Sequence, residues 1–276
     1  MSYPPIGIFD SGVGGLSVLR ALRAQIPAQP VIYLADQAHV PYGPRTLEEV
    51  LHFSREITRF LLAQGADTIV VACNTASAAA LQPLRREFPS TQFVGMEPAV
   101  KPASEHTRSG VVGVLATPAT FQGKLYASVM ERFAQHTRVL EYTCPGLVEE
   151  IEAGRLEGPR ARQILADGLL PMLEQGIDTV VLGCTHYPFA IPIVQEIVGP
   201  GVRVIDPAPA VARQIGRVLA ARGTLAGSGA PGAVRYITTA AGPAQLELPL
   251  RILLGETAPA ETAWWQPDGR LAITGA

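Results

Sequence analysis

Two cysteines recur in matching sequence contexts, and a thiol can remove a proton from carbon and return one. Cys73 and Cys184 each end a segment that reads Gly-x-Asp-Thr, then an apolar run and a small residue. The two segments begin at Gly65 and Gly176, about 110 residues apart. A single cysteine at the end of a strand is usually a small buried hydrophobic residue. Recurrence in the same context favours a shared chemical role for this pair.

The repeat extends to both sides of each cysteine. Ile6–Phe9 precedes the first cysteine much as Val112–Leu115 precedes the second, and Glu97 parallels Asp206 downstream, where we expect turns. A period this long excludes a solenoid and predicts two α/β units of one topology that face each other. Ligands of such units bind at the carboxyl ends of the strands, so a cleft between them would carry one thiol on each wall.

The elements that would position these thiols are short apolar runs alternating with amphipathic stretches. The runs are apolar throughout, as a parallel sheet covered on both faces requires. The predicted strands are Ile6–Phe9, Val31–Leu34, Thr68–Ala72, Gln92–Gly95, Val111–Leu115, Val139–Tyr142, Thr179–Leu182, Val202–Ile205 and Val234–Thr238. The alternation predicts an α/β fold, with helices over Leu47–Ala63, Gly123–Phe133, Pro159–Gln175, Ala190–Val198 and Ala210–Ala221.

Two thiols on opposite walls could remove and return a proton on opposite faces of one carbon. We expect a helix N-terminus after each cysteine, which would favour the thiolate and could hold a carboxylate. The two halves differ in their helper groups. Asp10 aligns with Ala116, and Thr75 aligns with His186, so one half offers a carboxylate and the other an imidazole. Glu152 adds a carboxylate in the second half.

The glycine-rich segment Asp10–Leu16 is not a nucleotide-binding loop, because it lacks both the G-x-G-x-x-G order and a following GKS/T. It is compatible with an anion site for a carboxylate and with a tight turn that needs glycines at positive φ. Val40–Gly43 forms a second loop, which could close over a ligand or simply turn the chain. We expect Trp264 and Trp265, near the end of the chain, to serve packing.

Composition excludes several classes of function. The chain has 276 residues, is 47% hydrophobic and carries a net charge of −2, which argues against disorder and against nucleic acid as a main partner. Three cysteines are too few for a disulfide scaffold, and Cys144 lacks the repeated context, so we expect it to be structural or to line the cleft. No metal site is expected, because no zinc-ligand spacing is present.

The first residues show no basic segment followed by a long apolar one, and no apolar run reaches about 18 residues. We therefore expect a cytoplasmic protein with free thiols and no membrane contact.

In combination, the motifs resemble the glutamate racemases, within the cofactor-independent aspartate/glutamate racemase superfamily. The resemblance runs from Ile6 to about Leu254. It departs from the family at Ala35, Gln37 and Ala116, where glycine, threonine and glycine are more usual. The motifs that carry it are Phe9-Asp10-Ser11-Gly12-Val13-Gly14-Gly15, Val40-Pro41-Tyr42-Gly43, Ala72-Cys73-Asn74-Thr75-Ala76-Ser77, Cys144-Pro145 with Glu152, and Leu182-Gly183-Cys184-Thr185-His186-Tyr187-Pro188.

The resemblance implies interconversion of L- and D-glutamate, which would supply D-glutamate for peptidoglycan. It implies that Cys73 and Cys184 are the acid–base pair, assisted by Asp10, Glu152 and His186. The implied substrate contacts are Asp10, Ser11, Pro41, Tyr42, Gly43, Asn74, Thr75, Thr117, Thr185 and His186. It further implies a homodimer and two α/β domains related by an approximate twofold axis, with the active site between them. The first domain would comprise residues 1–98 and 208–276, and the second residues 99–207.

No cofactor is expected. Pyridoxal phosphate needs a Schiff-base lysine, and the only lysines, Lys101 and Lys124, lie outside the repeated strand-end contexts. Two other classes of function stay open at this point. An aspartate or hydantoin racemase or a decarboxylase of the same superfamily would share the cysteine pattern. A non-catalytic protein with two α/β lobes could bind an amino acid without needing either thiol.

Overall fold

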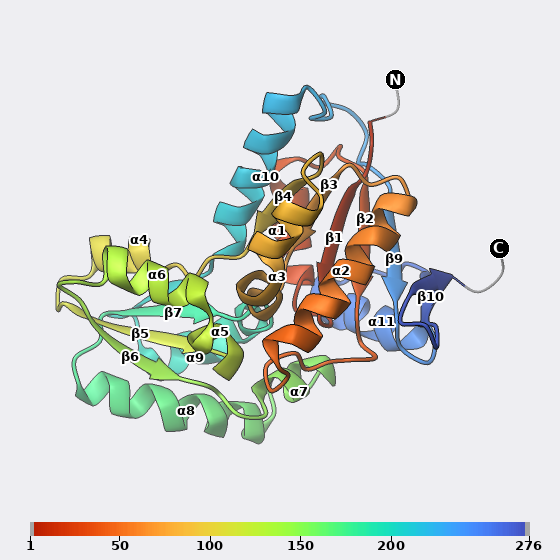
Figure 1. Ribbon diagram of the computed structural model, residues 1–276. Helices are drawn as coiled ribbons and strands as arrows, with labels where there is room; N and C mark the ends of the chain where they lie inside the picture. The colour runs from red at the N-terminus through yellow and green to blue at the C-terminus, as the bar shows by residue number, and fades with distance from the viewer. Residues whose placement is uncertain (1–2, 274–276) are drawn as a thin grey trace.

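The computed structural model describes residues 3–273, which form two parallel sheets flanked by helices, with an antiparallel strand at one edge (Figure 1). The larger sheet has the strand order β11-β10-β9-β2-β1-β3-β4, and the smaller has the order β6-β5-β7-β8. The strands are β1 Ile6–Asp10, β2 Val31–Ala35, β3 Thr68–Val71, β4 Gln92–Gly95, β5 Val111–Ala116, β6 Arg138–Tyr142, β7 Thr179–Gly183, β8 Arg203–Ile205, β9 Val234–Thr238, β10 Ala260–Trp265 and β11 Leu271–Ile273.

The repeat is confirmed in the topology. The order β2-β1-β3-β4 in one sheet matches β6-β5-β7-β8 in the other, so the strands before the two cysteines, β3 and β7, occupy equivalent positions. Both lie beside an equivalent central strand, β1 or β5, in parallel register. Every residue of β1, β2, β3 and β7 is buried, which explains why these runs are apolar without alternation.

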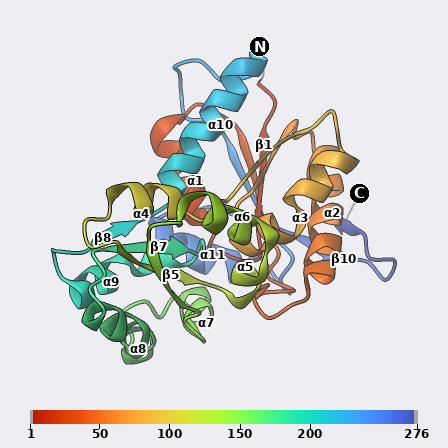
Figure 2. The ribbon, with the colours of Figure 1, turned by 60° about the vertical axis from the view of Figure 1, so that its left-hand side comes forward.

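Helices cover both faces of each sheet (Figures 1 and 2). In the larger sheet α1 and α10 pack on one face, and α2 and α3 on the other. In the smaller sheet α4 and α6 oppose α8 and α9. The helices are α1 Leu16–Gln25, α2 Leu47–Ala63, α3 Asn74–Glu87, α4 Val100–His106, α5 Pro118–Gln122, α6 Lys124–Phe133, α7 Leu147–Glu152, α8 Pro159–Glu174, α9 Ile191–Val198, α10 Ala208–Arg222 and α11 Ala244–Pro249, the last continuing into a π-helical turn, Leu250–Leu254.

The end of the chain returns to the larger sheet. β9 pairs with β2 in parallel, as expected for Val234–Thr238, and β10 adds a further parallel strand that the sequence reading did not predict. The boundaries of the two domains stay a prediction, and their outer ends, residues 1–2 and 274–276, lie outside the described residues.

One expectation about the cysteines is wrong in part. Cys73 caps α3, as predicted, but no α-helix starts directly after Cys184. A short 3₁₀ turn, Tyr187–Ala190, comes first, with Pro188 in it, and α9 follows. Throughout residues 3–273, every helix is too short or too polar to cross a membrane.

Candidate active site

A small cavity lies where the carboxyl ends of the two sheets meet. Both thiols line it, Cys73 from the larger sheet and Cys184 from the smaller. Its volume is about 10 Å³, room for one water molecule at most. The other lining residues are Ser11, Pro41, Tyr42, Gly43, Asn74, Thr75, Thr117, Thr185 and His186, all expected from the sequence, and Val148, which was not.

Cys73 sits at the N-terminus of α3, where its sulfur accepts a hydrogen bond from the backbone N–H of Ala76 at 3.4 Å. Its thiol points at Ser11 Oγ, 3.9 Å away. Burial raises the pKa of the Cys73 thiol and the nearby carboxylate of Asp10 raises it further, whereas the Ala76 N–H lowers it. Burial and the Asp10 charge therefore outweigh the expected stabilisation of the thiolate by the helix N-terminus.

Cys184 has an imidazole as its neighbour. Its Sγ lies 3.8 Å from His186 Nδ1, and His186 Nε2 lies 2.6 Å from Glu152 Oε1. Burial lowers the pKa of His186, but the hydrogen bonds to Cys184 and Glu152 outweigh burial and hold the pKa well above its usual value. The second wall, formed by the smaller sheet, thus presents the Cys184 thiol beside the His186 ring, whose protonated form is favoured.

Asp10 and Glu152, both predicted to act in proton transfer, lie behind the cavity and do not line it. Asp10 accepts hydrogen bonds from the Gly12 N–H and from Thr185 Oγ1, each at 3.0 Å, the latter from the opposite sheet. Burial raises the pKa of Asp10, and the positive charge of His186 offsets part of that rise. Each carboxylate therefore reaches the cavity indirectly, through a hydrogen bond to a residue that lines it.

The glycine-rich turn after β1 allows the two walls of the cavity to approach each other closely. None of its glycines has a positive φ, so the prediction that this turn needs glycines for that conformation is wrong. A Cβ on Gly12 would lie 1.9 Å from Glu152 Oε1, and one on Gly14 would lie 2.4 Å from His186 Nδ1. The absence of side chains lets the imidazole and carboxylate of the second wall pack directly on the first.

Within residues 3–273, one polar side chain of the cavity finds no hydrogen-bond partner. Both polar atoms of the Asn74 side-chain amide are buried and lack a hydrogen bond. Thr75 Oγ1 and Thr117 Oγ1 meet across the cavity at 2.8 Å. A buried amide costs free energy unless it is bonded, so Asn74 is available to a polar ligand.

Sequence reasoning missed the residue that holds the Val40–Gly43 loop. Asp36 is fully buried and accepts hydrogen bonds from Tyr42 Oη at 2.6 Å, Thr239 Oγ1 at 2.7 Å and Trp265 Nε1 at 2.8 Å. Trp265 thus packs as expected, and its strand supports the loop. Asp36 directly follows β2, so the strand-end rule that found the cysteines could have found it.

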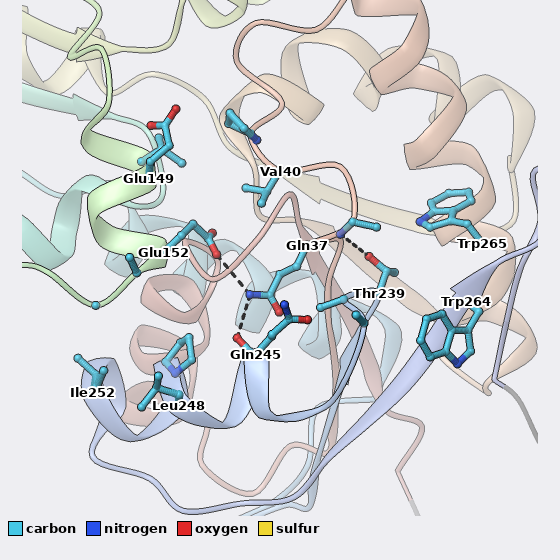
Figure 3. A pocket seen from close by; sticks show the side chains of 18 residues that line it. Gln37, Val40, Glu149, Glu152, Thr239, Gln245, Leu248, Ile252, Trp264 and Trp265 are labelled. Atoms are coloured by element: carbon cyan, nitrogen blue, oxygen red, sulfur yellow. Dashed lines mark hydrogen bonds between the residues drawn. The ribbon is translucent and has the colours of Figure 1, made fainter.

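A larger cavity of about 720 Å³ opens beside the site (Figure 3). Gln37, Glu152 and Pro41 line its inner side, and the exposed Leu248, Ile252 and Trp264 its outer side. Cys144 lines neither cavity and is buried. Within residues 3–273, no cluster of His, Cys, Asp and Glu could hold a metal ion.

Comparison with known proteins agrees with this geometry. The family model for Asp/Glu/hydantoin racemases matches residues 11–215. A glutamate racemase from Pseudomonas aeruginosa (strain UCBPP-PA14) is 52% identical over 250 residues, which cover 91% of this chain and 94% of that protein. The crystal structure of a glutamate racemase isoform from Bacillus anthracis is similar with a TM-score of 0.85 at 31% identity, covering 97% and 99% of the two chains. The Escherichia coli glutamate racemase, in complex with L-glutamate and the activator UDP-MurNAc-ala, gives a TM-score of 0.82 at 31% identity, covering 99% and 100%.

Proposed function

This chain belongs to the Asp/Glu/hydantoin racemase family, and we propose that it interconverts L-glutamate and D-glutamate by proton transfer at the α-carbon. The observation that carries the proposal is the pair of thiols, Cys73 and Cys184, which come from equivalent strand ends of two sheets and line one cavity. A single carbon held between them would have an acid–base group on each face.

In the proposed reaction one cysteine, as thiolate, takes the α-proton and becomes a thiol. The opposite cysteine, as thiol, donates its proton to the other face of the carbon and becomes a thiolate. The roles exchange with the enantiomer bound, so no net proton is gained or lost. His186, backed by Glu152, would stabilise the thiolate of Cys184, while Asp10 and Ser11 lie beside Cys73.

The substrate would bind through the polar groups of the cavity. The unpartnered amide of Asn74 can both donate to a carboxylate and accept from an ammonium group. The hydroxyls of Ser11, Thr75, Thr117 and Thr185, with the backbone N–H groups after Cys73, can hold a carboxylate and stabilise negative charge that develops at the α-carbon. Pro41, Tyr42 and Gly43 would close the site from the loop side.

Two supports favour glutamate over other substrates. Relatives with about half their residues identical over most of both chains are named glutamate racemases. The similar Escherichia coli structure is described as a complex with L-glutamate.

We further propose the physiological setting that the family resemblance implies. The enzyme would be a cytoplasmic homodimer that supplies D-glutamate for peptidoglycan without a cofactor. Each subunit would consist of the two domains given above, residues 1–98 with 208–276 and residues 99–207.

The test is racemisation of single enantiomers with no cofactor added. We expect the optical rotation of L-glutamate and of D-glutamate to decay to zero, with deuterium entering the α-position in D₂O. Faster decay with L-aspartate would point to the aspartate racemases instead. Activity that depends on added pyridoxal phosphate would contradict the two-thiol mechanism. Binding of glutamate without α-proton exchange would make the protein a binder.

A further inference from the structure

Gln37 connects the larger sheet to the imidazole–carboxylate pair of the second wall. It follows β2 and lies outside the thiol cavity. Its Nε2 donates to Glu152 Oε2 at 3.3 Å and to the backbone carbonyl of Gln245 at 3.0 Å (Figure 3). Its Oε1 accepts from Thr238 Oγ1 at 2.7 Å. One side chain therefore joins β9 and α11 of the larger sheet to Glu152 at the end of α7.

These partners determine which way the amide faces. The Gln245 carbonyl and the Glu152 carboxylate can only accept, so both require the NH₂ side of Gln37. Thr238 Oγ1 already accepts from the backbone N–H of Ala240 at 3.0 Å, so its own proton is free for Gln37 Oε1. Both amide protons and the amide oxygen are used, which pins the side chain at three points.

Glu152 needs this support because its two oxygens are unequally held. Oε1 accepts from the Val13 N–H at 2.7 Å and from His186 at 2.6 Å. Among the residues that the structure describes, only Gln37 bonds to Oε2. The terminal torsion of a glutamate is soft, so a carboxylate held at one oxygen can turn about it. The second contact restrains that rotation and keeps Oε1 aimed at His186.

We propose that Gln37 is a positioning residue that holds the Glu152 carboxylate against His186 and so keeps the imidazole in place beside the Cys184 sulfur. The expected effect on kcat rests on the proposed function, whereas the expected effect on the reactivity of Cys184 does not. Among the described residues, Gln37 makes no hydrogen bond to Ser11, to Asp10 or to the Ala76 N–H, which surround the Cys73 thiol. His186 acts on Asp10 through its charge, so we expect a smaller effect on Cys73 than on Cys184.

The test compares the two thiols within one protein. Iodoacetamide reacts with thiolates, and mass spectrometry reports each cysteine separately. Gln37→Met keeps the side-chain length and removes all three hydrogen bonds. We expect it to slow alkylation of Cys184 about fivefold while Cys73 changes by less than about twofold, the scale of a weakened charge-assisted hydrogen bond. Gln245→Ala is the matched control, because only its backbone carbonyl meets Gln37, and it should leave the ratio unchanged.

Coupling to Glu152 is tested by a double-mutant cycle. Glu152→Gln should lower the Cys184:Cys73 ratio, and adding Gln37→Met should lower it no further. In steady state, Gln37→Met should lower kcat for glutamate about tenfold with KM within about twofold. Gln37→Glu retains the acceptor for Thr238 but loses both donors, so it should lower the ratio even if the methionine variant folds poorly.

An unchanged ratio in Gln37→Met or Gln37→Glu, or additive effects in the cycle, overturns the proposal. A wild-type protein that racemises no amino acid refutes the proposed function, yet the alkylation ratio still decides the role of Gln37.

Discussion

The two thiols that line the cavity have different neighbours. Cys73 lies beside Ser11 and is influenced by the Asp10 charge, whereas Cys184 lies beside His186. A chiral carbon presents different substituents to the two walls, so unequal helper groups on the walls are consistent with protons that arrive on opposite faces.

Removing either thiol should abolish most of the activity. We expect Cys73→Ala and Cys184→Ala each to reduce the rate of glutamate racemisation by about 10²–10⁴-fold, the usual contribution of a positioned acid–base group. Cys144→Ala is the matched control, because this thiol is equally buried but lines neither cavity, and it should keep nearly all of the activity. Polarimetry on the three variants decides the matter, and wild-type rates in either of the first two would refute the mechanism.

The ion pair between His186 and Glu152 should make stability depend on pH. The pKa of His186 is raised in the folded protein, whereas an unfolded histidine titrates near about 6.5. The folded state therefore holds this proton more tightly, and the resulting stabilisation is complete below about pH 6.5 and is lost as pH rises through the folded value.

Glu152→Gln should accordingly lower the free energy of unfolding by about 3 kcal/mol at pH 6, the scale for breaking a buried pair, and by less at pH 9. Urea unfolding at the two pH values measures the difference. Glu149→Gln, an exposed carboxylate on the same helix, serves as control and should show little effect at either pH. A destabilisation by Glu152→Gln that grows with pH would contradict the assigned protonation of His186.

At the scale of elements, the turn between β1 and α1 sets how closely the two walls meet. Gly14 has no positive φ, so an alanine there fits the backbone but not the space. Its Cβ would lie 2.4 Å from His186 Nδ1 and 2.6 Å from Thr185 Oγ1.

We therefore expect Gly14→Ala to displace His186 and reduce kcat/KM for glutamate by about 10²-fold, the cost of misplacing a catalytic group by about 1 Å. Gly216→Ala within α10 is the matched control, since its Cβ would meet only Ile26, at 3.9 Å. That variant should keep full activity and gain about 0.5–1 kcal/mol in unfolding free energy. Equal activity in both variants would show that the close approach has no catalytic value.

Strands were predicted well where an apolar run in the sequence is also buried in the fold. The fully buried strands β1, β2, β3 and β7 were found within one residue at each end. β10 and β11 were missed, because Ala260–Trp265 and Leu271–Ile273 are not continuous apolar runs bounded by a helical pattern. β10 forms because the edge strand β9 offers backbone hydrogen bonds, and β11 then pairs with β10 in turn.

At the scale of the whole molecule, the two sheets meet so closely that the thiol cavity is almost filled. Its volume of about 10 Å³ cannot admit glutamate, so either the sheets or the Val40–Gly43 loop must move for substrate to enter and product to leave. The contact across the cleft includes Ala78 on α3 and Gly123 between α5 and α6, where a Cβ would lie 2.7 Å from the Ala78 Cβ.

A disulfide across this contact should lock the enzyme. Ala78→Cys with Gly123→Cys can form one after a shift of about 1 Å, since bridged Cβ atoms lie about 3.8 Å apart. We expect the oxidised double variant to lose at least about tenfold in racemisation rate and to recover on reduction, because opening is blocked. Wild-type protein taken through the same oxidation controls for damage to Cys73 and Cys184. Full activity in the demonstrably cross-linked protein would show that opening occurs elsewhere.

The α/β class and the repeated cysteine pattern could be predicted from the sequence because strand ends and their neighbours are local features, and the family resemblance implied nearly all the residues that line the cavity. The packing of the two sheets, by contrast, places Asp10 and Glu152 behind the cavity, uses glycines to bring the walls close together and makes Asp36 and Gln37 supports of the site. These relations join residues up to about 200 positions apart, as between Asp36 and Thr239. Their distances depend on how two sheets pack, which no local pattern encodes.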